Sequence, residues 1–233
     1  MNANSEAARI RQEYARRTAT IPAGFYSLDK PANYFAHCQL ARHAISLLER
    51  HELLPLRGRK ILDVGCGTGN WLLEFVQWGA SPADLYGIDL NAPRIEETRR
   101  RIPRAALETG DASVLPLPDA SVDLACQFAA LSSVLDPAMR QAVAAEMLRV
   151  LRPGGAILWY DLRLNNPANP AVRAISLFEI RRLFPGCTLD GRRVTLAPPI
   201  ARAVAPRSWI LAALLERIPV LRSHYLVLIR KSS

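Results

Sequence analysis

Apolar and polar positions follow two different periods along the chain. Between Tyr34 and His51 the residues Leu40, Ala44 and Leu47 recur at helical spacing, which predicts a helix. Further helices are predicted over Ser5–Thr18, Trp71–Trp78, Pro93–Arg101, Pro137–Leu151 and Ser208–Arg217. Short apolar runs predict strands over Lys60–Val64, Leu85–Asp89, Ala105–Thr109, Val122–Phe128, Ala156–Tyr160, Arg192–Leu196 and Tyr225–Arg230.

The order of these elements predicts the fold class. From Lys60 onward strands and helices alternate, which is typical of an α/β fold whose parallel sheet carries helices on both faces. The final strand follows a short turn after Pro219, so we expect it to run antiparallel to its neighbours. The chain is therefore predicted to be one compact unit. A Rossmann-like, seven-stranded, mostly parallel sheet occupies residues 53–233, and a helical segment over residues 1–52 precedes it.

The composition and the distribution of apolar residues bear on whether the protein is folded, membrane-spanning or secreted. Half of the 233 residues are hydrophobic, which is enough for a sizeable core. No apolar run reaches the ~20 residues that span a bilayer, and the stretch Trp209–Leu215 is shorter and is followed by Glu216 and Arg217. The N-terminus has no apolar segment of the kind found in secretory signals. We therefore expect a cytoplasmic protein without a transmembrane segment.

The net charge of +9 raises the question of an anionic partner. Nearly all of the positive charge is arginine, and the arginines are spread through every segment. The densest run, Arg99–Arg101, lies at the end of a predicted helix. This distribution favours a solvated surface, with attraction of an anionic substrate as the alternative, and we do not expect nucleic acid as a partner.

The cysteines do not form a metal or disulfide pattern. Cys38, Cys66, Cys126 and Cys187 are isolated from one another, without a C-x-x-C pair. Zinc sites and disulfide frameworks rest on characteristic cysteine spacings that are missing here. We therefore expect free thiols and no metal site.

A glycine-rich turn joins a predicted strand to a predicted helix at Asp63–Gly69. Its glycines allow a tight turn and the close approach of a ligand to the backbone. Dinucleotide sites have G-x-G-x-x-G spacing, whereas Gly65, Gly67 and Gly69 are spaced G-x-G-x-G. The carboxylate of Asp63 would repel a pyrophosphate and attract an ammonium group. The turn therefore favours a sulfonium ligand that carries an amino group over a dinucleotide.

Two further carboxylates follow predicted strands. Asp89 comes twenty residues after Gly69 at the end of the second strand, where it can accept hydrogen bonds from both hydroxyls of a ribose. A helix cap is the alternative role for this residue. Asp111 stands in the segment Gly110–Ala112 and could accept an adenine amino group, while the backbone N–H of Ala112 meets a ring nitrogen.

Five segments, in this order and at these distances, resemble the motifs of the class I S-adenosylmethionine (SAM)-dependent methyltransferases, among them the small-molecule enzymes of the ubiquinone-biosynthesis type. They are Asp63–Gly69, Gly87–Asn91, Gly110–Ala112, Ser121–Phe128 and Leu151–Gly155. The resemblance implies SAM as cofactor, S-adenosylhomocysteine (SAH) as product, and methyl transfer to a small-molecule acceptor by in-line displacement. The implied cofactor-binding residues are Asp63, Gly65, Cys66, Gly67, Gly69, Asp89, Leu90, Asp111, Ala112, Gln127 and Phe128.

The acceptor side departs from the family pattern. Many relatives have a histidine pair after the fourth strand, whereas this chain has Leu131–Leu135 there without a histidine. Tyr160 and Asp161 end the fifth strand and are the candidate catalytic residues. Asp161 would act as a base or would order the loop that follows it. The acceptor is expected to be anionic or apolar.

Two segments outside the motifs have alternative interpretations. Residues 1–52 either form a lid or cap over the SAM-binding domain of residues 53–233, or pack on the sheet edge. The apolar run Trp209–Leu215 is expected to be buried in the core, with a pocket cap or a dimer contact as alternatives. The chain is accordingly expected to be a monomer or a homodimer.

Two other functions are compatible with part of this pattern. An NAD-dependent oxidoreductase of Rossmann type would share the strand–turn–helix unit, although the glycine spacing and the Gly110–Ala112 segment argue against it. A methyltransferase-like binding subunit would share every motif and lack turnover. Comparing the equilibrium binding of SAM with that of NAD distinguishes an oxidoreductase from a methyltransferase. A turnover assay distinguishes a binding subunit from an enzyme.

Overall fold

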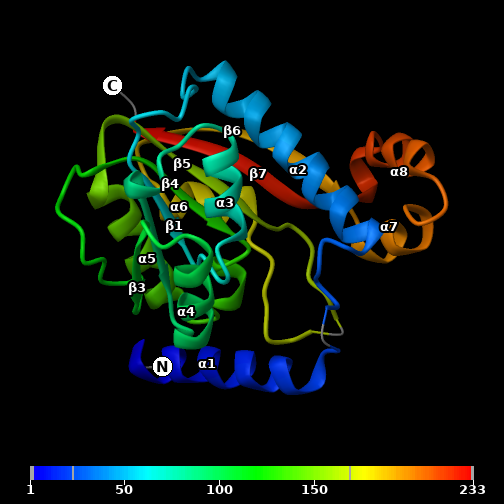
Figure 1. The fold of residues 1–233 in the computed structure, drawn as a ribbon, viewed down its shortest axis with the longest axis horizontal. Helices are drawn as coiled ribbons and strands as arrows, with labels where there is room; N and C mark the ends of the chain where they lie inside the picture. The colour runs from blue at the N-terminus through cyan, green and yellow to red at the C-terminus, as the bar shows by residue number, and fades with distance from the viewer. Residues whose placement is uncertain (1–2, 23, 168, 232–233) are drawn as a thin grey trace.

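A seven-stranded sheet with the order β3-β2-β1-β4-β5-β7-β6 organises the chain (Figure 1). The computed structural model describes residues 3–22, 24–167 and 169–231. The strands are β1 (Ile61–Val64), β2 (Leu85–Asp89), β3 (Ala106–Thr109), β4 (Val122–Phe128), β5 (Leu151–Leu162), β6 (Cys187–Leu196) and β7 (Arg222–Lys231).

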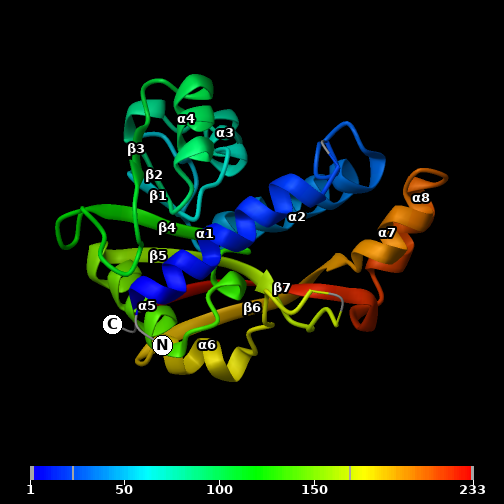
Figure 2. The same ribbon diagram turned by 90° about the horizontal axis from the view of Figure 1, so that it is seen from below.

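The strand directions confirm the predicted topology. Strands β1 to β5 pair in parallel with their neighbours, and β7 runs antiparallel to both β5 and β6. Six strands therefore point one way and the last strand points the other. Antiparallel neighbours need no crossover over the face of the sheet. Accordingly α7 (Pro198–Val204) and α8 (Trp209–Glu216), which connect β6 to β7, lie beyond the ends of these strands (Figures 1 and 2).

Helices cover both faces of the sheet, as predicted. Leu124, Cys126 and Leu158 share one cluster with residues of α2 (Pro31–Arg50) and α3 (Asn70–Gln77). Ala125 and Ile157 share the opposite cluster with residues of α5 (Pro137–Val150) and α6 (Leu177–Leu183). Because successive side chains of a strand point to opposite faces, a strand covered on both sides is apolar throughout. This explains why Leu124–Cys126 in β4 and Ala156–Tyr160 in β5 are continuous apolar runs.

Several element bounds differ from the sequence predictions. Strand β5 begins at Leu151 instead of Ala156, and Leu151 pairs with Val122 before the register shifts. Gly154, with φ of 77°, lets the strand pass through the Arg152–Gly155 turn. Helices α6 and α7 were not predicted, because seven residues are too few to establish a helical period. Strands β6 and β7 are also longer than predicted.

The N-terminal segment contributes two helices that lie far apart. Helix α1 (Ala3–Thr20) lies beside α4 (Ala92–Arg101) and close to α5, whereas α2 crosses the sheet toward α7 (Figures 1 and 2). No helix among the described residues is long and apolar enough to cross a membrane. The expectation that the Trp209–Leu215 run is core was wrong, since Trp209, Ile210, Leu211 and Leu214 are exposed.

Candidate active site

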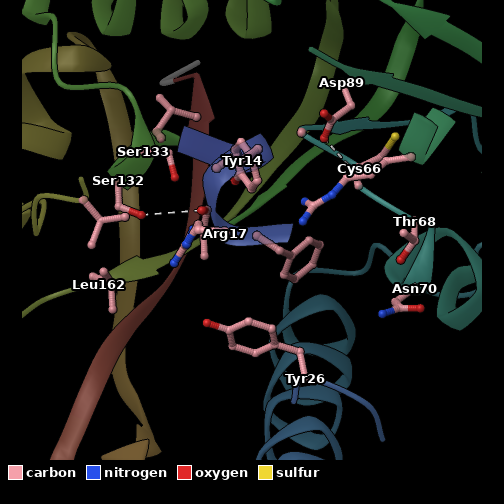
Figure 3. Close-up of a pocket in the computed structure, with 18 of the residues that line it drawn as sticks. Tyr14, Arg17, Tyr26, Cys66, Thr68, Asn70, Asp89, Ser132, Ser133 and Leu162 are labelled. Carbon is pink, nitrogen blue, oxygen red and sulfur yellow. Dashed lines mark hydrogen bonds between the residues drawn. The ribbon is translucent and has the colours of Figure 1, made fainter. Parts of the chain in front are cut away.

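A cavity of about 1400 Å³ lies at the carboxyl ends of the parallel strands. In open α/β sheets this edge is where ligands bind, because the loops that leave the strands diverge there. The segments that follow β1, β2, β3 and β4 all contribute to its wall. In Figure 3, Cys66, Thr68, Asn70 and Asp89 lie on one side, and Ser132, Ser133 and Leu162 lie on the other.

The glycine turn after β1 forms one wall of the cavity. Gly65, Gly67 and Gly69 have φ angles of 73°, 55° and 77°, a left-handed conformation that residues with a Cβ rarely adopt. A Cβ on Gly65 would lie 2.5 Å from Cβ of Ala130, so that glycine is required by packing. A Cβ on Gly67 would approach nothing closer than 3.8 Å. At Gly67 the missing side chain therefore leaves space inside the cavity.

Asp63 is a buried carboxylate without a complete set of partners. It lines the cavity, is 2% exposed, and its Oδ1 atom has no hydrogen-bond partner among the described residues. Burial, together with the charge of Asp89, raises the pKa of Asp63 well above its ordinary value. An unpaired buried carboxylate is costly, and a cationic ligand would compensate it. This orphaned atom fits the amino group of the cofactor that the sequence predicts.

Asp89, at the end of β2, supports the glycine turn. Its Oδ2 atom accepts a hydrogen bond of 2.9 Å from the backbone N–H of Gly67, and its Oδ1 atom accepts one of 2.8 Å from Asn91. A carboxylate has about four acceptor positions, so each oxygen can accept a further bond. Asp89 and the following Leu90 both line the cavity.

We expect Asp89→Ala to weaken SAM binding and to destabilise the free protein. Loss of charge-assisted bonds to a ribose would cost roughly 2–4 kcal/mol of binding free energy. Loss of the two backbone contacts would leave the N–H groups of Gly67 and Asn91 without this acceptor, which lowers the free energy of unfolding. Calorimetric titration and urea unfolding measure the two effects. Wild-type SAM affinity in this variant would remove Asp89 from the cofactor site.

The segment after β3 lines the same cavity. Gly110, Asp111 and Ala112 contribute to the wall. The Oδ1 atom of Asp111 accepts a hydrogen bond of 2.8 Å from the backbone N–H of Ser113, which leaves its other oxygen for a ligand. Met139 and Val143 of α5 line the cavity too and supply apolar surface of the kind that a purine ring contacts.

Of the two cofactor-binding residues predicted at the end of β4, Gln127 and Phe128, only Phe128 lines the cavity. Gln127 is buried and does not line the cavity; its side chain donates to the Tyr160 carbonyl and accepts from the backbone N–H of Ala130. The wall instead contains Phe128, whose ring stacks on Trp71 at 3.9 Å, and Ala129, whose φ is 57°. A non-glycine residue in this region of φ is strained, and such residues cluster at functional sites. Gly69 also lies outside the wall.

Tyr160 and Asp161 do not line the cavity. The Tyr160 hydroxyl is 3.0 Å from Oγ1 of Thr195, and its ring stacks on His224 with centroids 4.6 Å apart. The Oδ2 atom of Asp161 accepts a hydrogen bond of 2.9 Å from the backbone N–H of Ser132. Ser132 and His224 do line the cavity. The two predicted catalytic residues therefore contact the residues of the wall rather than the space inside it.

The buried carboxyl of Asp161 makes stability depend on pH. Burial raises its pKa from 3.8 to about 6, and the hydrogen bonds that it accepts oppose the rise. Because the folded state binds this proton more tightly, the free energy of unfolding falls as pH rises between these two values, by about 3 kcal/mol in total. We expect the free energy of unfolding of Asp161→Asn not to show this fall over the same pH range. Urea unfolding of both proteins checks the prediction, which fails if their pH profiles run parallel.

Several residues of the wall are not among the predicted cofactor-binding residues, although one interpretation of residues 1–52 was a lid over that site. Tyr14 and Arg17 of α1 face the cavity, and the guanidinium of Arg94 lies 4.4 Å from the centre of the Tyr14 ring (Figure 3). Ser132 and Ser133 belong to a 3-10 turn at Leu131–Ser133. A polar amphipathic helix gives no sequence signal for the surface on which it will pack, so these contacts had no local signature.

The wall of the cavity also contains apolar residues outside the glycine turn, among them Ile21, Phe25, Leu164 and Pro198, together with Arg202. The guanidinium of Arg202 lies 4.8 Å from the centre of the Phe25 ring. An apolar wall with a cation at its margin suits an acceptor that has an apolar body.

The four cysteines are free thiols, as predicted. Cys66 lines the cavity, and burial raises its pKa, which keeps the thiol protonated and unreactive. Within residues 3–22, 24–167 and 169–231, no group of three or more potential metal ligands is present.

Comparisons with known proteins identify the central part of the chain. Residues 61–155 match a family described as a methyltransferase domain. The chain is 36% identical over 120 residues to a protein of Mycolicibacterium smegmatis named as a probable S-adenosylmethionine-dependent methyltransferase. It is 38% identical over 115 residues to the phthiotriol/phenolphthiotriol dimycocerosates methyltransferase of Mycobacterium tuberculosis. The matches cover 47% and 48% of this chain and 42% and 41% of those proteins, so the chain spans less than half of their length.

A solved structure extends the likeness to the whole fold. The 1,6-didemethyltoxoflavin-N1-methyltransferase of Burkholderia thailandensis, bound to 1,6-didemethyltoxoflavin and S-adenosylhomocysteine, superposes with a TM-score of 0.68. The superposition covers 100% of this chain and 92% of that one at 20% identity, which establishes the shared fold. Residues 61–155 therefore match a methyltransferase domain, and the whole chain shares the fold of this methyltransferase structure.

Proposed function

We propose that this chain transfers a methyl group from SAM to a small-molecule acceptor by in-line displacement, leaving SAH. The observation that carries the proposal is the unpaired, buried carboxylate of Asp63 beside the glycine turn, in a cavity whose wall also contains apolar residues. A pyrophosphate in the same turn would face this carboxylate, so the geometry argues against NAD. The match to a methyltransferase domain and the name of one relative also support methyl transfer.

The residues around the turn divide the binding of SAM among them. We assign Asp63 to the amino group, Asp89 to the ribose hydroxyls, and Asp111 with Ala112 to the adenine. Gly65, Cys66, Gly67 and Leu90 give backbone or side-chain surface to the same ligand, and Phe128 extends that surface. SAM supplies an activated methyl group on a sulfonium. The chain holds the acceptor in line and excludes water.

Gly69 and Gln127 belong to this site as supporting residues. A Cβ on Gly69 would lie 2.5 Å from Cγ2 of Thr98, so this glycine lets the turn pack on α4. Gln127 holds the backbone that follows β4. Both act on the cofactor through the shape of the wall.

Tyr160 and Asp161 are proposed to position the acceptor. Asp161 fixes the backbone of Ser132, and Tyr160 packs on the ring of His224. Burial lowers the pKa of His224 to about 4, so its ring is neutral at pH 7. In this arrangement Ser132 and His224 are the groups that face an acceptor.

We propose that residues 1–52 form a lid or cap on the SAM-binding domain of residues 53–233. Tyr14 and Arg17 line the cavity from α1, and Glu6 accepts a hydrogen bond of 2.5 Å from the backbone N–H of Leu135. These contacts tie α1 to the loop before α5. Residues 1, 2 and 23 of the predicted lid lie outside the described residues.

The proposed acceptor is a small molecule with an apolar body. The apolar residues of the cavity wall support this, and Arg17 and Arg202 in the same wall suit a partial negative charge. One relative is named for phthiotriol/phenolphthiotriol dimycocerosates, and a structural neighbour holds 1,6-didemethyltoxoflavin. The ubiquinone-type subgroup and a cytoplasmic location stay predictions.

Calorimetric titration and a transfer assay test the proposal. We expect SAM and SAH to bind and NAD not to bind. Incubation with methyl-labelled SAM and a panel of apolar alcohols, phenols and carboxylic acids should place label on at least one of them. Tight binding of NAD with no binding of SAM would contradict the assignment of the site. Binding of SAM without transfer to any cellular extract fraction would favour the binding-subunit alternative.

A further inference from the structure

Helix α8 and the turn after it expose an unusual amount of apolar surface. Ile210 is 77% exposed and Val220 is 70% exposed. We use the name α8 patch for the six exposed large apolar residues of this region, Trp209, Ile210, Leu211, Leu214, Ile218 and Val220. Scattered apolar side chains are ordinary on a protein surface, but a contiguous group marks a contact with a partner or with lipid.

A surface helix usually turns its large apolar side chains toward the core, and α8 exposes most of them instead. The positions that it buries are Ala212 and Glu216, while Ile210, Leu211 and Leu214 are exposed. Ala212 and the partly buried Leu215 pack in a small cluster with Ala201, Ala205 and Phe35. The inner contact of α8 therefore leaves three of its large apolar side chains unused by the fold.

The surroundings of the α8 patch are positively charged. Arg202, Arg207 and Arg217 are exposed around it. From residue 198 to residue 221, the segment that contains α7 and α8, the chain has three arginines, no lysine and one acidic residue, Glu216. Glu216 is buried, so it offers no charge to the surface. The patch is therefore apolar with a cationic rim.

The α8 patch continues into the mouth of the cavity. Trp209 contacts the rings of Tyr34 and Phe35, with centroids 5.7 and 5.6 Å apart. Arg202 reaches the exposed Phe25 of the loop before α2, which lines the cavity. The views in Figures 1 and 2 agree that this loop and α8 lie at the same end of the molecule. An apolar molecule that leaves a membrane at α8 would meet Phe25 at the wall of the cavity.

We propose that the α8 patch docks the protein on the surface of a membrane that contains anionic lipid. Tryptophan and aliphatic side chains enter the interface between headgroups and acyl chains, and arginines contact the lipid phosphates. A second copy of the chain is a poorer partner. A two-fold contact through this face would bring the same arginines together, and the only acidic residue of that segment is buried. The proposal does not depend on the identity of the methyl acceptor.

Sedimentation of the full chain with lipid vesicles tests the proposal. Vesicles of phosphatidylcholine alone are compared with an equimolar mixture of phosphatidylcholine and phosphatidylglycerol. We expect binding to the anionic vesicles that weakens with added salt, and little binding to the neutral ones. Absence of binding to anionic vesicles, or equal binding to both kinds, would overturn the proposal.

Matched variants separate the α8 patch from general surface hydrophobicity. Ile210→Gln with Val220→Gln should weaken vesicle binding about tenfold or more. The control is Val114→Gln with Phe178→Gln, two apolar residues outside the patch that are 76% and 71% exposed. We expect this control pair to bind as the wild type does. Equal loss in both pairs would overturn the assignment to α8.

A second pair of variants tests the charged rim. Arg207→Gln with Arg217→Gln should weaken binding to anionic vesicles about tenfold or more, since each arginine near a lipid surface contributes roughly a factor of five. Arg181→Gln with Arg182→Gln, on α6, changes the net charge equally and should have little effect. Sedimentation equilibrium without lipid completes the test. A wild-type dimer that the α8 variants dissociate, without vesicle binding, would assign the patch to self-association instead.

Discussion

Gly67→Val is expected to lower SAM affinity by more than about 100-fold while the protein stays folded. A Cβ at this position would meet no protein atom closer than 3.8 Å, so the new side chain would occupy the cavity itself. The φ angle of 55° adds strain of roughly 1–2 kcal/mol for a residue with a Cβ. Calorimetric titration measures the loss of binding, and circular dichroism checks the fold.

A matched glycine separates strain from obstruction. Gly58 has a φ of 75°, and a Cβ added there would also meet open space, with nothing within 4 Å, but Gly58 does not line the cavity. Gly58→Val should therefore lose a similar amount of stability and keep wild-type SAM affinity. If both variants bind SAM normally, the ligand lies elsewhere. If both lose binding, strain rather than obstruction is responsible.

Asp63→Asn is expected to weaken SAM binding by roughly 2–3 kcal/mol and to stabilise the free protein. The substitution removes the charge that would pair with the amino group. It also removes a buried carboxylate whose Oδ1 atom has no partner among the described residues. The substitution therefore raises the free energy of unfolding of the free protein and lowers its affinity for SAM. Opposite effects of this kind indicate a residue that serves binding rather than stability.

The raised pKa of Asp63 gives the same residue a pH dependence. The pKa of this carboxyl is higher in the folded protein than in the unfolded chain, so the folded state holds the proton more tightly. The free energy of unfolding of the free protein therefore falls as pH rises from the unfolded-state pKa to the folded-state pKa. SAM affinity should rise with pH through the folded pKa of Asp63, because the ionised form binds the cation. Asp63→Asn should lose both dependences.

Asp161→Asn is the control for burial. Asp161 is as buried as Asp63 but lies outside the cavity wall, so this variant should keep SAM affinity within a few-fold of the wild type. Loss of SAM binding in both variants would mean that the assignment of Asp63 to the cofactor is not specific.

Much of the fold and of the cofactor site could be predicted because both depend on local patterns. The short apolar runs Leu124–Cys126 of β4 and Ala156–Tyr160 of β5 are continuous since these strands are covered on both faces, and the parallel order of the strands follows from the helices between them. Asp63, the glycine turn and Asp89 lie at strand ends, and the ends of neighbouring parallel strands meet at one edge. Their proximity follows from the topology alone.

The acceptor side required the tertiary structure. Tyr160 and Asp161 end a strand at the same edge, yet Thr195 and the backbone of Ser132 engage their polar atoms outside the cavity. Those partners lie 35 and 29 residues away along the chain. No local pattern encodes such pairings, because they depend on which strands become neighbours in the sheet.

The helices at the two ends of the chain also show which features follow from the sequence and which require the tertiary structure. The sequence alone indicated helices over Ser5–Thr18 and Ser208–Arg217, and it gave a lid over the cofactor domain as one interpretation of residues 1–52. Only the tertiary structure decided which side chains of α1 reach the cavity and that α8 turns Ile210 toward solvent. The face that a helix buries depends on the surface it meets, and α8 packs Ala212 and Leu215 on its neighbours while Ile210 stays outside.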